Sequence, residues 1–311
     1  MSKIGIIANP HSKLNKRNPN RQKILGFIVG ERGRLEVTNT LDELKAVVED
    51  FSAKGVEIIA INGGDGTISR TLTAIIQAFK DKPLPKIALL RGGTMNVIAG
   101  ELQIKGLPEQ VLYRLIETHS SGLPLRLEKL RTIQVDGEYY GFLFGNGAAA
   151  YFLEEFYKKK TGSIRASWLV IKLILSRFFG QKLWNRIIPN FNCHLKPRGL
   201  PGVKHQSCAV FCSTVQRLPL GVQIFPDAKK DPAKFQCVSA AIESKKLIWK
   251  IPFFIFEKKN KIECGKMTFI TDSLKIETDQ SIPYTLDGEI YLPKSNEMEI
   301  TVGPEINFVV V

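Results

Sequence analysis

The first hundred residues alternate between short apolar runs and helical patterns, and this alternation constrains the fold more than any other feature. The runs are rich in β-branched residues and cover residues 3–8, 34–38, 56–61 and 86–90, as expected of buried strands. Between them, apolar side chains recur at helical spacing, most clearly in 19–29 and 41–54. Strands that alternate with helices predict an open, mostly parallel sheet with helices on both faces. Asn18 is the expected N-cap of 19–29, and Thr40 with Glu43 forms a capping box before 41–54.

After Pro124 the pattern changes to short β-rich runs separated by turn residues. Closely spaced strands of this kind predict a mostly antiparallel β-sandwich. We therefore expect two domains, residues 1–124 and 125–311, with the last strand able to pack back on the first domain. One helical insert is expected, at 163–179. The expected strands of this half are 132–135, 139–145, 207–215, 235–242, 267–271, 274–278, 299–302 and 307–311.

Glycine clusters follow the third and fourth expected strands, in "NGGDGT" (62–67) and "RGGTMN" (91–96). Glycines at such junctions let the backbone turn tightly and approach a ligand, and a helix N-terminus offers unpaired N–H groups to phosphate. Because ligands bind at the carboxyl ends of parallel strands, the two loops can converge on one polyphosphate. Neither loop is the common P-loop, which has a lysine directly after its last glycine.

Two further glycine motifs lie in the β-rich half. Gly145-Asn146-Gly147 is similar to a dinucleotide fingerprint, but we expect no amphipathic helix after it and predict a close-packing turn. Asp-Gly-Glu occurs twice, at 136–138 and 287–289. The earlier copy predicts a hairpin turn. The later copy has two interpretations of equal weight, a second hairpin or a pair of carboxylates that holds magnesium or takes a proton from a hydroxyl.

The formal net charge of +14 favours anionic partners such as nucleic acid, phosphorylated ligands or an acidic membrane surface. The longest apolar run, 168–175, is far shorter than a bilayer span. The insert 163–179 next to Lys158, Lys159 and Lys160 is expected either to dock on a membrane or to be a buried helix flanked by solvated lysines.

Taken together, these motifs resemble the diacylglycerol kinase catalytic-domain family, which includes sphingosine and ceramide kinases and bacterial lipid kinases. The resemblance rests on Asn9-Pro10 and on the motifs at 63–67, 93–96 and 287–289, which occur in the family's order. It spans nearly the whole chain. It implies a nucleotide-binding α/β domain followed by a β-sandwich, with ATP and Mg²⁺ as cofactors and a lipid as acceptor.

The resemblance also implies roles for individual residues. Asp65 would orient the metal-bound nucleotide, and Glu289 or Asp287 would be the base on the lipid hydroxyl, with Glu289 favoured. Asp231 is the candidate ligand of a structural magnesium ion. The implied nucleotide contacts are Asn9, Thr40 (or Thr38), Gly63, Gly64, Gly66, Thr67, Gly93, Thr94 and Asn96.

Three departures from the family pattern affect this transfer. The structural magnesium site of some bacterial relatives uses an Asp-Gly turn, and the nearest match here is Asp231-Pro232. Val97 stands where many diacylglycerol kinases have an aspartate, which leaves the substrate less defined than the activity. Arg91 stands where a proline is customary.

The sequence thus predicts an ATP- and Mg²⁺-dependent kinase that phosphorylates a hydroxyl of diacylglycerol or a related lipid, in the cytoplasm at a membrane surface. The expected partners are the lipid substrate and an anionic membrane rather than nucleic acid. The sequence is also compatible with a homodimer. One alternative is a soluble kinase with the same first loop, such as an NAD kinase or a phosphofructokinase, which lacks the other motifs. Another is a non-enzymatic binder of anionic lipid, which leaves both glycine loops unexplained.

Overall fold

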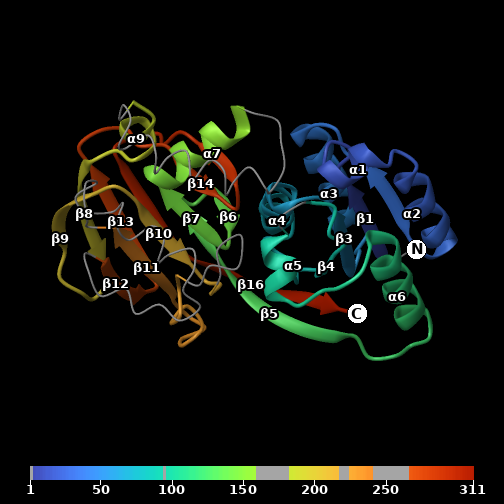
Figure 1. The fold of residues 1–311 in the computed structure, drawn as a ribbon. Coiled ribbons are helices and arrows are strands. Elements are labelled where there is room, and N and C mark those ends of the chain that lie inside the picture. Colours follow the sequence, from blue (N-terminus) through green and yellow to red (C-terminus); the bar gives the residue numbers. More distant parts are fainter. Residues whose placement is uncertain (1–2, 94–95, 159–181, 217–223, 241–265) are drawn as a thin grey trace. The chain divides into compact units, whose positions relative to one another are not determined.

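The computed structural model describes residues 3–93, 96–158, 182–216, 224–240 and 266–311 (Figure 1). The chain divides into two compact units, and each is described by itself. Unit 1 comprises Met1–Thr132 and Pro304–Val311, and unit 2 comprises Ile133–Gly303.

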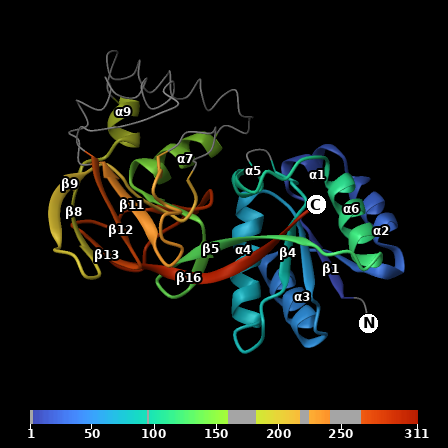
Figure 2. The ribbon, with the colours of Figure 1, turned by 90° about the horizontal axis from the view of Figure 1, so that it is seen from below.

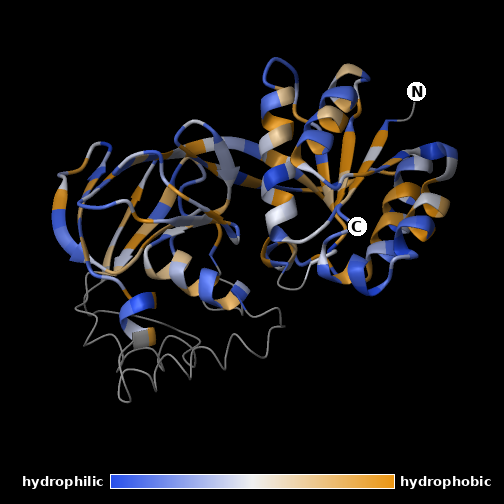
Figure 3. Cartoon of the chain, turned by 90° about the horizontal axis from the view of Figure 1, so that it is seen from above, coloured by the Kyte–Doolittle hydropathy of each residue, from blue (hydrophilic) through white to orange (hydrophobic). Residues whose placement is uncertain are grey.

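Unit 1 contains a parallel sheet built from β1 (Ile4–Ala8), β2 (Arg34–Val37), β3 (Ile58–Asn62), β4 (Lys86–Leu89) and the end of β16 (Glu297–Val310). The strands lie in the order β2-β1-β3-β4-β16, and β16 runs parallel to β4 through the pair Phe308 and Ile87. β1 and β3 are buried at every position because helices cover both faces of the sheet. Figure 3 shows these strands as mostly hydrophobic.

The helices of unit 1 lie on both faces of this sheet. Figure 2 places the sheet between the pair α2 and α6 and the pair α3 and α4. The bounds are α1 (Lys13–Arg17), α2 (Arg21–Val29), the short 3₁₀ turn η1 (Gly30–Arg32), α3 (Leu41–Ala53), α4 (Asp65–Ala78), α5 (Val97–Glu101) and α6 (Pro108–Ser120). Thr40 caps α3 as predicted, because its side chain accepts the N–H of Glu43. Asn18 does not cap α2: it ends α1 instead, and the N-cap of α2 is Asn20.

Unit 2 is a β-sandwich. One sheet contains β13 (Ser273–Thr278), β8 (Phe191–Pro197), β9 (Val203–Ser207), the end of β5 (Arg126–Val135), β6 (Tyr139–Gly141) and the first part of β16. The other runs in the order β12 (Lys266–Thr271), β11 (Phe235–Ala240), β10 (Val210–Ser213), β7 (Leu143–Asn146), β14 (Tyr284–Leu286) and β15 (Glu289–Tyr291). Strand pairs within the second sheet are antiparallel. The core lies between the sheets and includes Phe191 and Leu195 from the first and Phe144 and Phe235 from the second.

The predicted fold class is confirmed, an α/β unit with a mostly parallel sheet followed by an antiparallel β-sandwich. Several elements differ from the prediction. The expected strand 139–145 is two strands, β6 and β7, in different sheets. The expected strand 207–215 is two strands in different sheets, because the chain turns a corner at Cys208 and Ala209. The expected strands 299–302 and 307–311 form the single β16, which continues through Gly303-Pro304. β5 begins at Arg126 rather than at residue 132. The prediction missed its first half because the charged side chains there mask the apolar pattern.

An amphipathic helix, α7 (Ala148–Lys158), follows Gly147 directly, so our expectation of no helix there is wrong. The close packing is nevertheless present. Gly147 has φ +60°, and a Cβ there would lie 2.4 Å from the carbonyl oxygen of Cys208. The remaining described helix is α9 (Lys182–Ile187).

The insert 163–179 lies outside the described residues, as do Lys159, Lys160 and Thr94. Lys158 ends α7 and pairs with Glu154. Within the parts of the chain that the structure describes, every helix is too short or too polar for a membrane span.

Candidate active site

The first glycine loop joins β3 to α4 at the carboxyl edge of the sheet. Asn62 ends the strand, Gly64 is the N-cap of α4, and no side chain caps this helix. Gly63 is required here, because a Cβ at this position would lie 2.4 Å from the Cβ of Thr67. Asn9, at the end of β1, donates from Nδ2 to Thr67 Oγ1 at 2.9 Å. The loop therefore presents the uncapped N-terminus of a helix, held to the neighbouring strand by one side-chain bond.

The second glycine loop packs against the first, backbone to backbone. A Cβ at Gly93 would lie 2.5 Å from the Cα of Gly64, and a Cβ at Gly92 would lie 2.9 Å from the nitrogen of Gly63. Contacts below 3.0 Å do not occur for real side chains, so only glycine fits at these positions. The structure thus brings together the two loops that the sequence predicted would converge.

Asp65 connects the two loops. Its carboxylate Oδ1 accepts the backbone N–H of Val97 at 2.8 Å, the first residue of α5. Asp65 is half-buried, and burial raises the pKa of its carboxyl, although the backbone N–H groups of Val97 and Ile98 oppose this shift. Asn96, which precedes α5, has a left-handed backbone (φ +47°) and donates from Nδ2 to the carbonyl of Gly93 at 3.0 Å. Asp65 therefore lies at the N-termini of two helices, α4 and α5.

A network of asparagines supports the loops from the side of α1, and the sequence analysis missed it. Asn15 is buried and donates from Nδ2 to the carbonyls of Asn9, at 2.7 Å, and Asn62, at 3.4 Å. Asn62 donates in return to Asn15 Oδ1 at 3.3 Å. The N–H of Leu14 bonds to the carbonyl of Gly92 at 3.2 Å. α1 thus joins the ends of three strands. The signal in the sequence was an asparagine directly after each of two buried strands.

The other predicted nucleotide contacts are less uniform in position. Thr40 lies at the same edge of the sheet, after β2, but its hydroxyl is already the acceptor that caps α3. Thr38 is buried, and its N–H bonds to the carbonyl of Ala8. Gly66 lies within the first turn of α4.

Asp287 and Glu289 belong to unit 2, on the hairpin between β14 and β15. Asp287 is buried and has a left-handed backbone (φ +48°). Its carboxylate accepts the N–H groups of Phe142, at 3.0 Å, and Leu143, at 2.9 Å, where the chain bends between β6 and β7. Glu289 is half-buried and begins β15. The hydroxyl of Tyr157 on α7 donates to the carbonyl of Gly288 at 2.9 Å and covers the tip of the hairpin.

Asp231 lies in an exposed turn of unit 2. Its Oδ1 accepts the N–H of Ala233 at 2.9 Å, and its Oδ2 lies 3.1 Å from the ammonium of Lys234. These two contacts, the first of them dominant, lower the pKa of its carboxyl. Across the described ranges, no three His, Cys, Asp or Glu residues gather in a way that could hold a metal ion. Metal binding at Asp231 stays a prediction.

Residues 3–125 match the family model of the diacylglycerol kinase catalytic domain. The matched family is one of kinases, which are phosphotransferases that use ATP. No curated protein matches the chain.

Solved structures support the same fold. A diacylglycerol kinase from Bacillus anthracis str. Sterne has a TM-score of 0.69 at 14% identity, over 100% of this chain and 97% of its own. A second structure from this organism has a TM-score of 0.73 at 15% identity, over 100% of this chain and 98% of its own. An NAD kinase from Archaeoglobus fulgidus, solved with ATP, has a TM-score of 0.51 at 11% identity, over 98% of this chain and 93% of its own. At these identities the likeness establishes the fold alone.

Proposed function

We propose that the protein is an ATP- and Mg²⁺-dependent lipid kinase that transfers a phosphoryl group to a hydroxyl of diacylglycerol or a related lipid. The observation that carries the proposal is the backbone contact between the two glycine loops, combined with the kinase family of residues 3–125. Phosphoryl transfer needs positioning and charge stabilisation more than covalent chemistry from the protein. Two helix N-termini at one edge of a sheet supply both.

The uncapped N-terminus of α4 would bind the phosphates of the nucleotide. Its N-cap, Gly64, has no side chain that could accept the first N–H groups, and the helix dipole favours negative charge there. Gly63 and Gly93 leave the backbone open to close approach, since neither carries a side chain. Asn9 and Thr67 would fix this turn relative to β1 through their hydrogen bond.

Asp65 would hold the two loops together and would supply the negative charge that binds a magnesium–nucleotide complex. Mg²⁺ is usually held by one or two carboxylates together with substrate phosphates and water, and the half-buried Asp65 at the loops fits this donor set. The ion would neutralise charge on the transferred phosphoryl group. Val97 and the N-terminus of α5 hold the carboxylate in place through its other role as a helix cap.

Glu289 would take the proton from the lipid hydroxyl, and Asp287 would hold the hairpin that carries it. We assign the roles in this order because the carboxylate of Asp287 is already occupied by two backbone N–H groups in a buried site. A residue in that position is better placed to support its neighbour than to exchange protons with a substrate. Glu289 follows directly on the anchored turn.

The first prediction tests the assignment of Asp65. Radiolabelled ATP is incubated with the protein and, in separate reactions, with extracted lipids, NAD and sugar phosphates. We expect label in a lipid product only, and loss of transfer in Asp65→Asn. Asparagine retains an acceptor for Val97 but removes the charge, so the free energy of unfolding should change by no more than about 1 kcal/mol.

Labelled NADP or a sugar bisphosphate would replace this proposal with the soluble-kinase alternative. Wild-type transfer rates in Asp65→Asn would contradict the role of the charge. Gln22→Ala, on the half-buried side of α2, is a matched control that should leave transfer unchanged.

A further inference from the structure

The outer side of α2 and α6 exposes large apolar side chains to water. Phe27 is 92% exposed, Tyr113 54% and Ile24 42%. The inner side of α2 already supplies the residues that pack in the core, Leu25 and Val29. Exposure of an aromatic ring beside other apolar groups contributes nothing to folding, and contiguous exposed apolar groups mark interaction sites.

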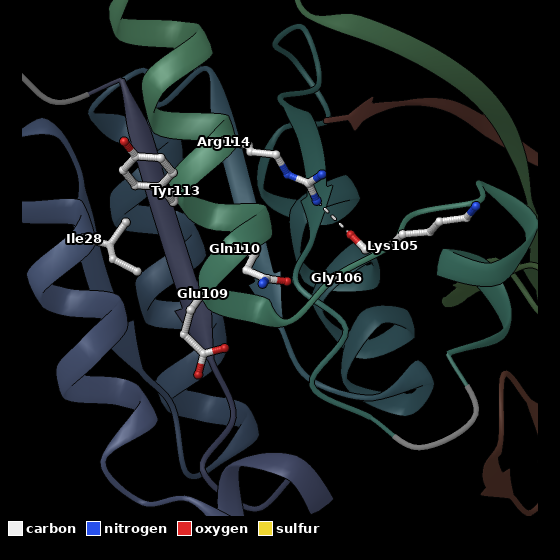
Figure 4. Close-up of a pocket in the computed structure, with 7 residues that line it drawn as sticks. All are labelled: Ile28, Lys105, Gly106, Glu109, Gln110, Tyr113 and Arg114. Atoms are coloured by element: carbon white, nitrogen blue, oxygen red, sulfur yellow. Dashed lines mark hydrogen bonds between the residues drawn. The ribbon is translucent and has the colours of Figure 1, made fainter.

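The two helices run side by side in the same direction. Arg21 at the start of α2 pairs with Glu109 at the start of α6, and Arg32, just after α2, pairs with Glu117 near the end of α6. An open pocket of about 640 Å³ lies along this pair (Figure 4). Ile28 and Tyr113 supply its apolar part, and Arg114 reaches across to the carbonyl of Lys105 at 2.7 Å. Ile28 follows Phe27 in α2 and lies one turn after Ile24, so these exposed apolar groups adjoin the pocket that the two helices share.

The segment that carries α1 and α2 is rich in positive charge. The segment 11–29 contains no acidic residue, and its basic residues are Lys13, Lys16, Arg17, Arg21 and Lys23. Arg21 is neutralised by Glu109, whereas Lys16, Arg17 and Lys23 are exposed and form no ion pair with any residue that the structure describes. The surface formed by Ile24, Phe27 and Tyr113 with Lys16, Arg17 and Lys23 is called the α2–α6 face below.

We infer that the α2–α6 face docks on an anionic lipid bilayer. Aromatic and aliphatic side chains enter the boundary between headgroups and acyl chains, and the surrounding lysines and arginines attract anionic headgroups. A second copy of the chain fits less well, because a two-fold contact through this face would bring the same unpaired cations together. The need to visit a bilayer rests on the proposed lipid kinase function.

The position of this face suits that function within unit 1. α1 carries Lys16 and Arg17, and the N–H of Leu14 bonds to the carbonyl of Gly92 in the second glycine loop. The side chain of Arg21 in turn donates to the carbonyl of Leu14 at 2.9 Å. The α2–α6 face is thus anchored by hydrogen bonds to the edge of the sheet that carries both glycine loops.

The second prediction tests this docking by co-sedimentation without nucleotide. The full chain is mixed with vesicles of phosphatidylcholine alone, or of equal parts of phosphatidylcholine and phosphatidylglycerol. We expect binding to the mixed vesicles only, weakened by salt. Phe27→Ala should weaken binding about tenfold, and Lys16→Gln and Lys23→Gln about fivefold each.

Leu200→Ala and Lys204→Gln, which alter an exposed leucine and an exposed lysine of unit 2, are the matched controls and should bind as the wild type does. Equal binding to both kinds of vesicle, or unchanged binding of Phe27→Ala and the lysine variants, would overturn the inference. A dimer that Phe27→Ala dissociates without any change in vesicle binding would also overturn it, in favour of a second copy.

The assay separates this inference from the proposed function. Vesicle binding that depends on Phe27 and on phosphatidylglycerol would stand even if no lipid accepted phosphate. Phosphorylation of a short-chain diacylglycerol, dissolved as monomers, should be unchanged in Phe27→Ala, because this residue lies outside the proposed catalytic groups. A proportional loss of that soluble reaction would instead assign Phe27 to the active site and overturn the docking role.

Discussion

The two Asp-Gly-Glu turns of unit 2 have the same three residues and a left-handed Asp-Gly pair, yet they are built into the molecule differently. Both aspartates and both glycines have positive φ angles, at Asp136 and Gly137 in the earlier turn and at Asp287 and Gly288 in the later one. The later copy is a two-residue hairpin because Leu286 pairs with Glu289, whereas in the earlier copy Val135 pairs with Tyr139 and three residues lie between them. The hairpin predicted for the earlier copy is confirmed, and the later copy is a hairpin as well.

The earlier turn lies near solvent. Asp136 Oδ1 accepts one backbone N–H, that of Glu299 in β16, at 2.8 Å, and Gly137 is exposed. Glu138 forms an ion pair with Lys294, which raises the pKa of that lysine. A glutamate held by an exposed lysine is part of a solvated surface and contributes little to stability.

The later turn is anchored to the rest of unit 2 by buried hydrogen bonds. Asp287 is buried and receives two backbone N–H groups, and Tyr157 covers the carbonyl of Gly288. Catalytic groups need support of this kind, because a base must be held within a fraction of an ångström of its working position. Both turns share the left-handed backbone of the Asp-Gly pair, while the surroundings decide whether the glutamate that follows can act as a catalytic group.

The largest expected effect, and the third prediction, is at Glu289. Glu289→Gln should lower the single-turnover rate of lipid phosphorylation by about 10²–10⁴-fold, the usual contribution of a general base. ATP affinity should stay the same, since the base acts on the acceptor. Rapid-quench kinetics with saturating ATP would measure this. A rate within a few-fold of wild type would erase the functional difference between the two turns.

The fourth prediction concerns the hydrogen bonds of Asp287 that anchor the later turn. Asp287→Ala leaves the buried N–H groups of Phe142 and Leu143 without their acceptor, so the free energy of unfolding should fall by about 2–3 kcal/mol. Denaturant unfolding would measure it. Asp287→Asn keeps one acceptor oxygen and should cost less. Equal stability of all three proteins would mean that Asp287 does not anchor the hairpin.

The smallest expected effect is at Glu138. Glu138→Gln removes an ion pair near solvent, so both the free energy of unfolding, within about 0.5 kcal/mol, and the rate of lipid phosphorylation should stay at wild-type values. Unfolding and turnover measured beside Glu289→Gln provide the direct contrast. A loss of activity comparable to that of Glu289→Gln would mean that the earlier turn also serves catalysis.

Much of unit 1 could be predicted because its signals are local. Buried parallel strands are read from short β-branched runs, and α4 from the buried spacing of Ile68, Leu72 and Ile75. The meeting of the glycine loops followed from topology, because neighbouring parallel strands end at the same edge. The length of β16 was missed for the converse reason, since Gly303-Pro304 is locally a break but lies inside a continuous strand.

What the sequence determined by itself was the order of elements, the positions where glycine is obligatory and the identity of the acids. Tertiary structure alone decided what each acid does. Asp65 caps a helix 32 residues further along the chain, and Asp287 accepts N–H groups from residues about 144 positions earlier. Such partners are brought together only when separate elements pack, so no local pattern encodes them. The same holds for the exposure of Phe27: its helical position was readable, but the side of α2 left open to solvent depends on where α6 packs.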